Sequence, residues 1–180
     1  FIAQKNGCKD FHLRSKKISG NSSSELEVFQ DFVFKNLKLN KKLPKYFIHF
    51  RPTTPVRYLK TINKVIKYFK ANKNKCSSMR STTLMSNPAY RYSRIINNKL
   101  CAIAKIDFNL DKYFRPRHFF PNTYISNCII DIYKTENILK GFLFGNKVMP
   151  YTTKDFRCDI DDLNDFKNVE YYIKKNNFKI

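Results

Sequence analysis

Three stretches of the chain repeat apolar residues at the spacing of an α-helix. The first, "SSSELEVFQDFVFKNL", begins with a capping signal, Ser22 three residues before Glu25, and continues with one apolar face: Leu26, Phe29, Phe32, Val33 and Leu37. The second follows Pro55 and has lysines opposite a similar face: Leu59, Ile62, Val65, Ile66 and Phe69. The third, residues 161–175, has acids at its start and lysines at its end, as the helix dipole favours. The pattern predicts three helices.

Short apolar and β-branched runs separate these helices. "YFIHF" (46–50) is typical of a buried strand, while "KLCAIAKI" (99–106) and "YISNCIIDIYK" (124–134) are also strand candidates. "CSSMRST" (76–82) is a weaker candidate, and "VMPYTT" (148–153) and "FRCDID" (156–161) are brief extended segments. The alternation predicts an α/β fold with a mainly parallel sheet flanked by helices, in one domain across residues 1–180. Ligands of such sheets gather outside the carboxyl ends of the strands.

The formal charge of +21 first suggests nucleic acid as a partner. However, the chain has 26 Lys and 9 Arg, and it is rich in Asn, Ile, Phe and Tyr, all residues with AT-rich codons. The lysines are also spread along the sequence, whereas a reading surface would be a clustered stripe. We therefore expect a solvated lysine surface, and a basic module that binds nucleic acid is the less favoured alternative.

The remaining composition indicates a cytoplasmic protein without a membrane anchor. No window approaches the roughly 18 apolar residues of a membrane span, and no signal peptide is visible. The five cysteines are scattered without a CxxC pair, and the three histidines show no ligand spacing, so a zinc site is not expected.

The segment "RPTTPVR" (51–57) directly follows the predicted strand at 46–50. Its two prolines fix φ and stiffen the turn before any ligand arrives. Thr53 and Thr54 offer hydroxyls, and Arg51 and Arg57 offer fork-shaped donors suited to carboxylate or phosphate. The alternative is a polar connection between a strand and a helix.

The segment "DID" holds two acids, Asp159 and Asp161, two residues apart. In an extended backbone such residues point to the same side, and two adjacent carboxylates favour a cation between them. Their hard oxygen ligands suit Mg²⁺ beside substrate phosphates. The alternative is that these acids cap the last helix, although Asp162 is better placed for that role.

Between 114 and 131, the stretch "FRPRHFFPNTYISNCIID" places Asn127 mid-strand among apolar neighbours. A buried asparagine needs hydrogen-bond partners, so Asn127 is either a structural bridge or a ligand contact. No nucleophile elbow and no Gly-rich phosphate loop occur in the chain.

Taken together, these stretches resemble the CMP-sialic acid synthetases (N-acylneuraminate cytidylyltransferases). "HFRPTTPVR" is similar to their "LxPTSPLR" signature, and "FHLRSKKISGNSSSELEVFQ" to their "RPxELAxD" region. "SSMRSTTLMSNPAYRYSRI" resembles "SxRxVxEMxxxPYKxFxI", "PRHFFPNTYISNCIIDI" resembles "PRQxLPxxYxxNGxIYI", and "CDIDDLNDFKNVEYYI" resembles "xDIDxxxDxxxAExxL". The motifs occur in the family's order over residues 3–175.

The resemblance implies a Rossmann-like fold of nucleotidyltransferase type and a Mg²⁺-dependent transfer of CMP from CTP to a nine-carbon acidic sugar, with release of pyrophosphate. It also implies a homodimer formed through about residues 112–147. Carried over by position, the residues implied as catalytic are Asp159, Asp161 and Arg57, of which the two aspartates hold the metal. Those implied as substrate-binding are Arg14 and Ser23 near cytosine and its ribose, Arg51, Thr53 and Thr54 in the bend, and Arg91, Arg117 and Asn127.

The chain departs from the family at several positions. His118 replaces a glutamine, Cys128 a glycine and Asp131 commonly a tyrosine. The family's first strand and its loop "ARxGSKxxxxKN", which holds the CTP phosphates, find no match here. Because the chain begins with Phe1, we expect a truncated form that is an incomplete catalyst; the alternative is an inactive relative that binds nucleotide or sugar.

Overall fold

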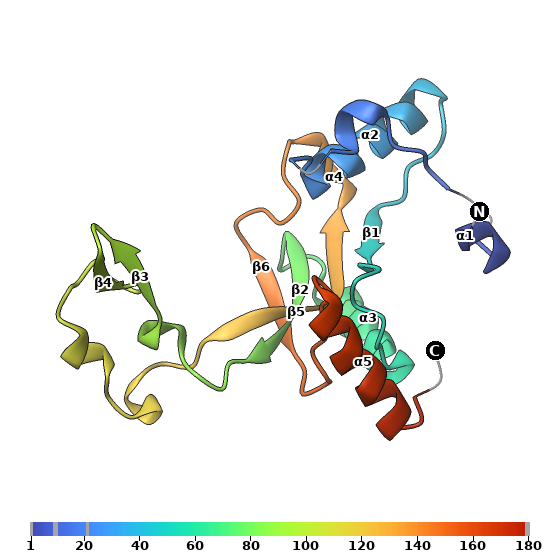
Figure 1. Ribbon diagram of the computed structural model, residues 1–180. Coiled ribbons are helices and arrows are strands. Elements are labelled where there is room, and N and C mark those ends of the chain that lie inside the picture. Colours follow the sequence, from blue (N-terminus) through green and yellow to red (C-terminus); the bar gives the residue numbers. More distant parts are fainter. Residues whose placement is uncertain (1, 9–10, 21, 179–180) are drawn as a thin grey trace. The chain divides into compact units, whose positions relative to one another are not determined.

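The structure is a computed structural model that describes residues 2–8, 11–20 and 22–178 (Figure 1). Its helices are α1 (Ile2–Lys5), α2 (Glu25–Lys38), α3 (Leu59–Asn72), α4 (Thr135–Leu139) and α5 (Leu163–Lys175). Its strands are β1 (Tyr46–His49), β2 (Ser78–Leu84), β3 (Ser93–Ile96), β4 (Lys99–Ala102), β5 (Tyr124–Lys134) and β6 (Val148–Thr152). Four short 3₁₀ turns complete the elements: η1 (Lys16–Ile18), η2 (Ala89–Arg91), η3 (Leu110–Tyr113) and η4 (Arg117–Phe119). The three helices expected from the apolar spacing are α2, α3 and α5.

Four strands form one sheet in the order β1-β5-β2-β6. The N–H of Ser77 donates to the carbonyl of Lys147, and that of Thr153 to the carbonyl of Thr82, so β2 and β6 run parallel. In contrast, Met85 donates to Thr123 while the hydroxyl of Ser81 accepts from the N–H of Ile130, so β5 runs antiparallel to β2.

The α/β class is therefore confirmed, but the sheet is mixed, and the expectation of a mainly parallel sheet is corrected. The physical reason lies in the connection between β2 and β5. A parallel neighbour needs a crossover, usually through a helix. Here the chain instead passes through the β3–β4 hairpin and several 3₁₀ turns, so β5 can return in the opposite direction.

The helix starts are fixed by side-chain caps. The hydroxyl of Ser24 accepts from the N–H of Glu27, whose carboxylate accepts in turn from the N–H of Ser24, forming a capping box at α2. The sequence-based cap at Ser22 was wrong by two residues. At α5 the carboxylate of Asp162 accepts from the N–H groups of Asn164 and Asp165, so the capping role expected of Asp162 is confirmed.

The chain divides into two compact units, and each has its own core. Unit 1 comprises Phe1–His49, Asn72–Met79 and Ile132–Met149. Its core gathers around Tyr133, against which Phe29 and Phe144 pack edge to face. The other buried members are Val33, Ile138 and Leu143.

Unit 2 comprises Phe50–Ala71, Arg80–Asp131 and Pro150–Ile180. Val56, Cys158 and Val169 form a buried cluster in it, covered by Phe156 and Tyr172, whose rings stack at 3.8 Å. Val56 closes the "RPTTPVR" bend and Cys158 precedes the "DID" segment, so this cluster places both stretches in the same unit.

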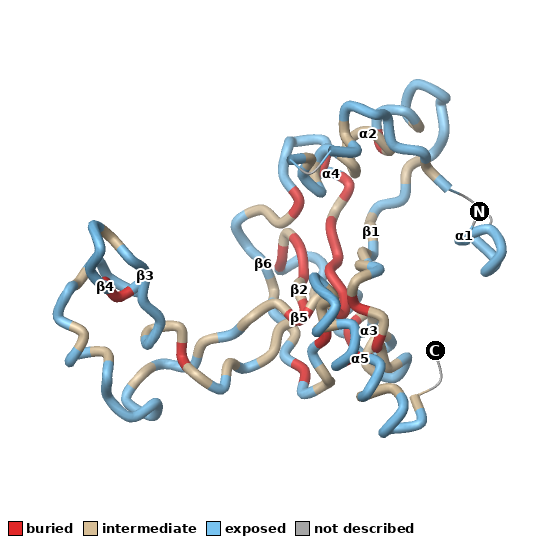
Figure 2. Tube along the Cα trace, viewed as in Figure 1, coloured by how far each residue is buried: buried red, intermediate tan, exposed pale blue. Residues whose placement is uncertain are grey.

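Burial along the strands differs from the expectation for residues 46–50. Most of β5 is buried (Figure 2). Ile129, Ile130 and Ile132 are among its buried residues. By comparison, β1 is at the end of the strand order, and its Ile48 is 43% exposed, so it is not the buried strand that its composition suggested. Of the strand expected at 99–106, only Lys99–Ala102 is a strand, β4, which pairs antiparallel with β3 in a separate two-stranded sheet; residues 103–106 form a turn.

Within the described part of the chain, no helix has the length and apolar content needed to cross a membrane.

Candidate functional site

The bend after β1 and the acidic segment before α5 meet in unit 2. The N–H of Ile160 donates to the carbonyl of Thr53 at 2.9 Å. The N–H of Thr54 also donates to the carbonyl of Arg51 at 3.1 Å, which closes the turn that Pro52 begins. The residues that the sequence singled out in these two stretches therefore lie side by side.

Arg57 holds the bend against β5. Its Nε donates to the carbonyl of Ile129 at 2.8 Å, and its Nη2 donates to the carbonyl of Arg51 at 2.6 Å and that of Cys128 at 3.4 Å. Its guanidinium also lies 5.2 Å from the centre of the Phe50 ring. Burial lowers the pKa of Arg57 below its usual value. These contacts make Arg57 a positioning residue in the described structure.

Arg51 joins a buried ion cluster that the sequence analysis missed. Its Nη1 lies 2.9 Å from Oδ2 of Asp131, which has no exposed surface. Arg80 approaches the same carboxylate, with Nε 3.3 Å from Oδ1 and Nη2 3.3 Å from Oδ2. Two cations thus share one carboxylate. The one signal in the sequence was an acid, Asp131, within the apolar run of 128–133.

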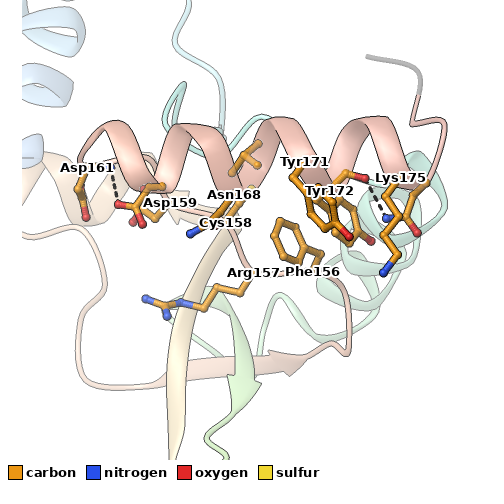
Figure 3. Close-up of a pocket in the computed structure, with 12 residues that line it drawn as sticks. Phe156, Arg157, Cys158, Asp159, Asp161, Asn168, Tyr171, Tyr172 and Lys175 are labelled. Carbon is orange, nitrogen blue, oxygen red and sulfur yellow. Dashed lines mark hydrogen bonds between the residues drawn. The ribbon is translucent and has the colours of Figure 1, made fainter.

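Asp159 and Asp161 line the same pocket, which has a volume of about 680 Å³ (Figure 3). The pocket follows α5, with the two acids toward the start of the helix and Tyr171, Tyr172 and Lys175 toward its end. The thiol of Cys128 lies 3.6 Å from Oδ2 of Asp159. Asp165 also lines the pocket, but its Oδ2 accepts from the N–H groups of Asp161 and Asp162.

The donor set of this pocket suits magnesium only in combination with a ligand. Among residues 2–8, 11–20 and 22–178, no group of three or more His, Cys, Asp or Glu side chains is arranged to hold a metal ion. Mg²⁺ is commonly bound by one or two carboxylates, with waters and substrate phosphates as its other ligands. The pair Asp159 and Asp161 fits that pattern, and a phosphate-bearing ligand would complete it.

The two threonines of the bend, Thr53 and Thr54, differ in solvent accessibility. Thr54 is fully buried, and its Oγ1 has no hydrogen-bond partner in the described part of the chain. Thr53 is half-buried, so its hydroxyl is the more accessible of the two.

Asn127 is fully buried, and its side chain links β5 to β2 and to Thr153, the residue after β6. Its amide donates to the hydroxyls of Thr83 and Thr153, both at 3.0 Å, and its carbonyl oxygen accepts from the N–H of Ile129. Both amide hydrogens are thereby used. Of the two roles that the sequence left open for Asn127, this geometry favours the structural bridge.

Arg14 and Ser23 line one small hollow in unit 1, with a volume of about 90 Å³. Ser24, Glu25, Phe29 and His49 share its lining. Glu25 and His49 were not expected as site residues, because each is unremarkable in its own stretch of sequence.

Arg91 and Arg117 are both exposed, on η2 and η4 of unit 2. Arg91 donates to the amide oxygen of Asn87 at 3.1 Å and lies 6.0 Å from the centre of the Phe114 ring. That Arg91 and Arg117 contact a sugar stays a prediction.

A scan against protein-family models finds no match to this chain. A search of curated proteins also finds no match.

Proposed function

We propose that the protein is a cytidylyltransferase that transfers CMP from CTP to a nonulosonic acid, a sialic acid or a related sugar, and releases pyrophosphate. The single observation that supports this most is the hydrogen bond between Ile160 and Thr53. It brings the arginine-bearing bend and the acid pair into one region of unit 2. The confirmed α/β class agrees with a nucleotidyltransferase-type, Rossmann-like arrangement, which forms part of the proposal.

In this reaction the anomeric hydroxyl of the sugar forms a bond to the α-phosphorus of CTP, and the bond from that phosphorus to the bridging oxygen of pyrophosphate breaks. The hydroxyl proton leaves to solvent or to a nearby base. Such transfers depend on alignment and on neutralising charge rather than on a protein nucleophile. When bound, Mg²⁺ would neutralise phosphate charge, and Asp159 and Asp161 would hold it.

Other residues of unit 2 would align the substrates for this reaction. Arg57 fixes the bend through its three carbonyl contacts, and the hydroxyl of Thr53 is accessible to a ligand beside the acid pair. Arg51 and Arg80 supply one net positive charge after pairing with Asp131, which favours an anionic ligand nearby.

The proposal includes a homodimer and a cytoplasmic location. The β3–β4 hairpin and the turns after it expose large apolar side chains: Ile95, Leu100, Ile103, Ile106, Phe108 and Phe114. Such a patch supports a protein contact. Ile132, Tyr133 and Ile138 are buried in unit 1, so we place the dimer contact before β5 reaches that core, within residues 93–124.

One observation favours a second candidate, a non-catalytic protein that binds nucleotide or sugar. Arg57 is directed at backbone carbonyls, and Arg51 is paired with Asp131. Neither of these two arginines is therefore directed at a triphosphate. Binding of CTP without turnover would favour this candidate.

The test is an assay of pyrophosphate release by the full-length protein from CTP and Mg²⁺ with sialic, legionaminic and pseudaminic acids. We expect turnover with at least one sugar, and its loss in Asp161→Ala. Glu170→Gln is the matched control, because Glu170 is exposed on α5 and does not line the pocket. Normal turnover in Asp161→Ala would overturn the metal assignment, and no release with any sugar would overturn the transferase proposal.

A further inference from the structure

Arg157 lines the pocket of unit 2 together with the acid pair, Asp159 and Asp161 (Figure 3). It precedes the first of these acids by two residues, and the family resemblance assigns it no role. Figure 3 shows its side chain extending toward the acid end of the pocket, away from Tyr171 and Lys175. The acid end of the pocket therefore has a guanidinium on the same side as two carboxylates.

The guanidinium of Arg157 is available to a ligand. Its side chain is exposed, and it makes no hydrogen bond or ion pair with the residues that the structure describes. The two arginines of the bend differ in this respect, because Arg51 is paired with Asp131 and Arg57 donates to backbone carbonyls. Arg157 thus keeps all five of its N–H donors for a ligand.

The formal charges that line the pocket do not balance. Three carboxylates, those of Asp159, Asp161 and Asp165, stand against two cations, Arg157 and Lys175, so the pocket has one net negative charge. An anion alone is therefore repelled, whereas a bound Mg²⁺ would reverse the sign of the pocket and attract one. A ligand with several negatively charged oxygens that binds together with Mg²⁺ suits this arrangement.

We propose that Arg157 binds phosphate oxygens of the nucleotide, at the end of the pocket where Asp159 and Asp161 would hold Mg²⁺. This inference rests on the proposed use of CTP. A guanidinium can donate two parallel hydrogen bonds to one phosphate, and such paired contacts between charged groups are strong. When the bond to the α-phosphorus breaks, negative charge develops on the departing pyrophosphate, and Arg157 would neutralise part of it. Inorganic pyrophosphate is therefore a direct probe of the contact.

The test is titration calorimetry of the full-length protein with inorganic pyrophosphate in the presence of Mg²⁺. We expect Arg157→Gln to bind pyrophosphate more weakly by roughly ten- to a hundredfold, the range for a hydrogen bond to a charged group. Arg157→Lys should have an intermediate affinity, because an ammonium keeps the charge but cannot make the paired contact.

Lys154→Gln is the matched control, since it removes one exposed positive charge from the same segment outside the pocket. It should bind pyrophosphate as tightly as the wild type. The thermal midpoint without ligand should be the same for all of these variants, because neither Lys154 nor Arg157 makes a polar side-chain contact within the described structure.

Two further titrations test the place of the contact. With EDTA in place of Mg²⁺, the wild type should lose pyrophosphate binding, because the carboxylates of the pocket repel the anion. Equally tight binding in EDTA would overturn the placement of Arg157 beside the metal. With sialic acid and Mg²⁺, Arg157→Gln should bind the sugar as the wild type does. If the sugar alone binds more weakly to this variant, Arg157 contacts the sugar carboxylate and the phosphate contact is overturned.

The outcomes separate this inference from the proposed function. If Arg157→Gln and the wild type bind pyrophosphate equally, or if the wild type does not bind it, the role of Arg157 is overturned, and turnover of CTP decides the transferase separately. If Arg157→Gln weakens pyrophosphate binding but no sugar supports turnover, the contact stands and belongs to the second candidate, a non-catalytic protein that binds nucleotide.

Discussion

The carbonyl of Thr53 accepts a hydrogen bond from the N–H of Ile160, across more than one hundred residues of sequence. Because both partners are backbone groups, the bond does not depend on either side chain. Beside it, Asp159 and Asp161 line the pocket, and Thr53 is half-buried in the bend. This relationship underlies the first prediction.

Removal of metal should abolish turnover without unfolding the protein. Asp161 is exposed and Asp159 is half-buried, so their charges stabilise a bound cation more than they stabilise the fold. We expect excess EDTA to stop pyrophosphate release and excess Mg²⁺ to restore it, with the thermal transition in the absence of nucleotide unchanged. Full activity in EDTA would contradict the role of the acid pair.

Replacing Arg57 with alanine should destabilise the protein by about 2–3 kcal/mol, because three carbonyl oxygens would lose a charged donor. Urea unfolding measures this free energy. Arg57→Lys should recover only part of it, since an ammonium cannot reproduce the fork of the guanidinium. Arg115→Ala, at an exposed position, is the control; an equal effect there would argue against a specific role for Arg57.

Asp131 and Arg51 should be energetically coupled. Removing the buried carboxylate in Asp131→Asn leaves two partly buried arginines without their countercharge, which costs roughly 3–5 kcal/mol. The double variant with Arg51→Gln should be less destabilised than the sum of the two single variants, by about 1–3 kcal/mol. Asp131→Asn combined with Arg115→Gln should be additive within error. Additivity in both pairs would mean that the ion cluster contributes nothing specific.

The sequence predicts the parts of this site that depend on local spacing, but it does not predict the contacts between distant strands. Asp159 and Asp161 line one pocket, and their closeness follows from their spacing of two residues, which the sequence itself reveals. The pairing of Asp131 with Arg80 depends on β5 lying antiparallel to β2 in one register, and a pattern of apolar residues does not specify register between distant strands. Likewise, the acceptors of Arg57 are backbone carbonyls, which every residue carries, so no side-chain pattern could indicate them.

The same contrast applies to the helix caps. Asp162 could be identified from the sequence because the residues that follow it are consistent with a single start of helix α5. At α2 three consecutive serines, Ser22 to Ser24, each precede a plausible first turn, and the choice depends on which acid can reach back. Glu27 does so, with its carboxylate 2.7 Å from the N–H of Ser24.

A pair of serine variants tests that choice. Ser24→Ala should cost about 1 kcal/mol of stability, because the N–H of Glu27 loses its acceptor. Ser22→Ala removes no cap and should fall within about 0.5 kcal/mol of the wild type. Chemical denaturation distinguishes these values, and a larger effect at Ser22 would restore the sequence-based cap.

The hydroxyls of Tyr58 and Tyr172 lie 2.7 Å apart in unit 2 and should give the protein a stability that is lost in strong alkali. The hydrogen bond with Tyr58, with burial as a second cause, raises the pKa of Tyr172 from 10.0 to about 12. The folded protein therefore keeps this proton more tightly than the unfolded chain, so the contribution is complete below pH 10 and disappears as the pH rises through about 12.

In Tyr172→Phe this part of the alkaline decline should be absent, so the thermal midpoints of variant and wild type should converge between pH 10 and pH 12. Tyr171→Phe, at the neighbouring exposed position, should follow the wild type throughout. Parallel curves for Tyr172→Phe and the wild type would show that this hydroxyl pair does not control the alkaline transition.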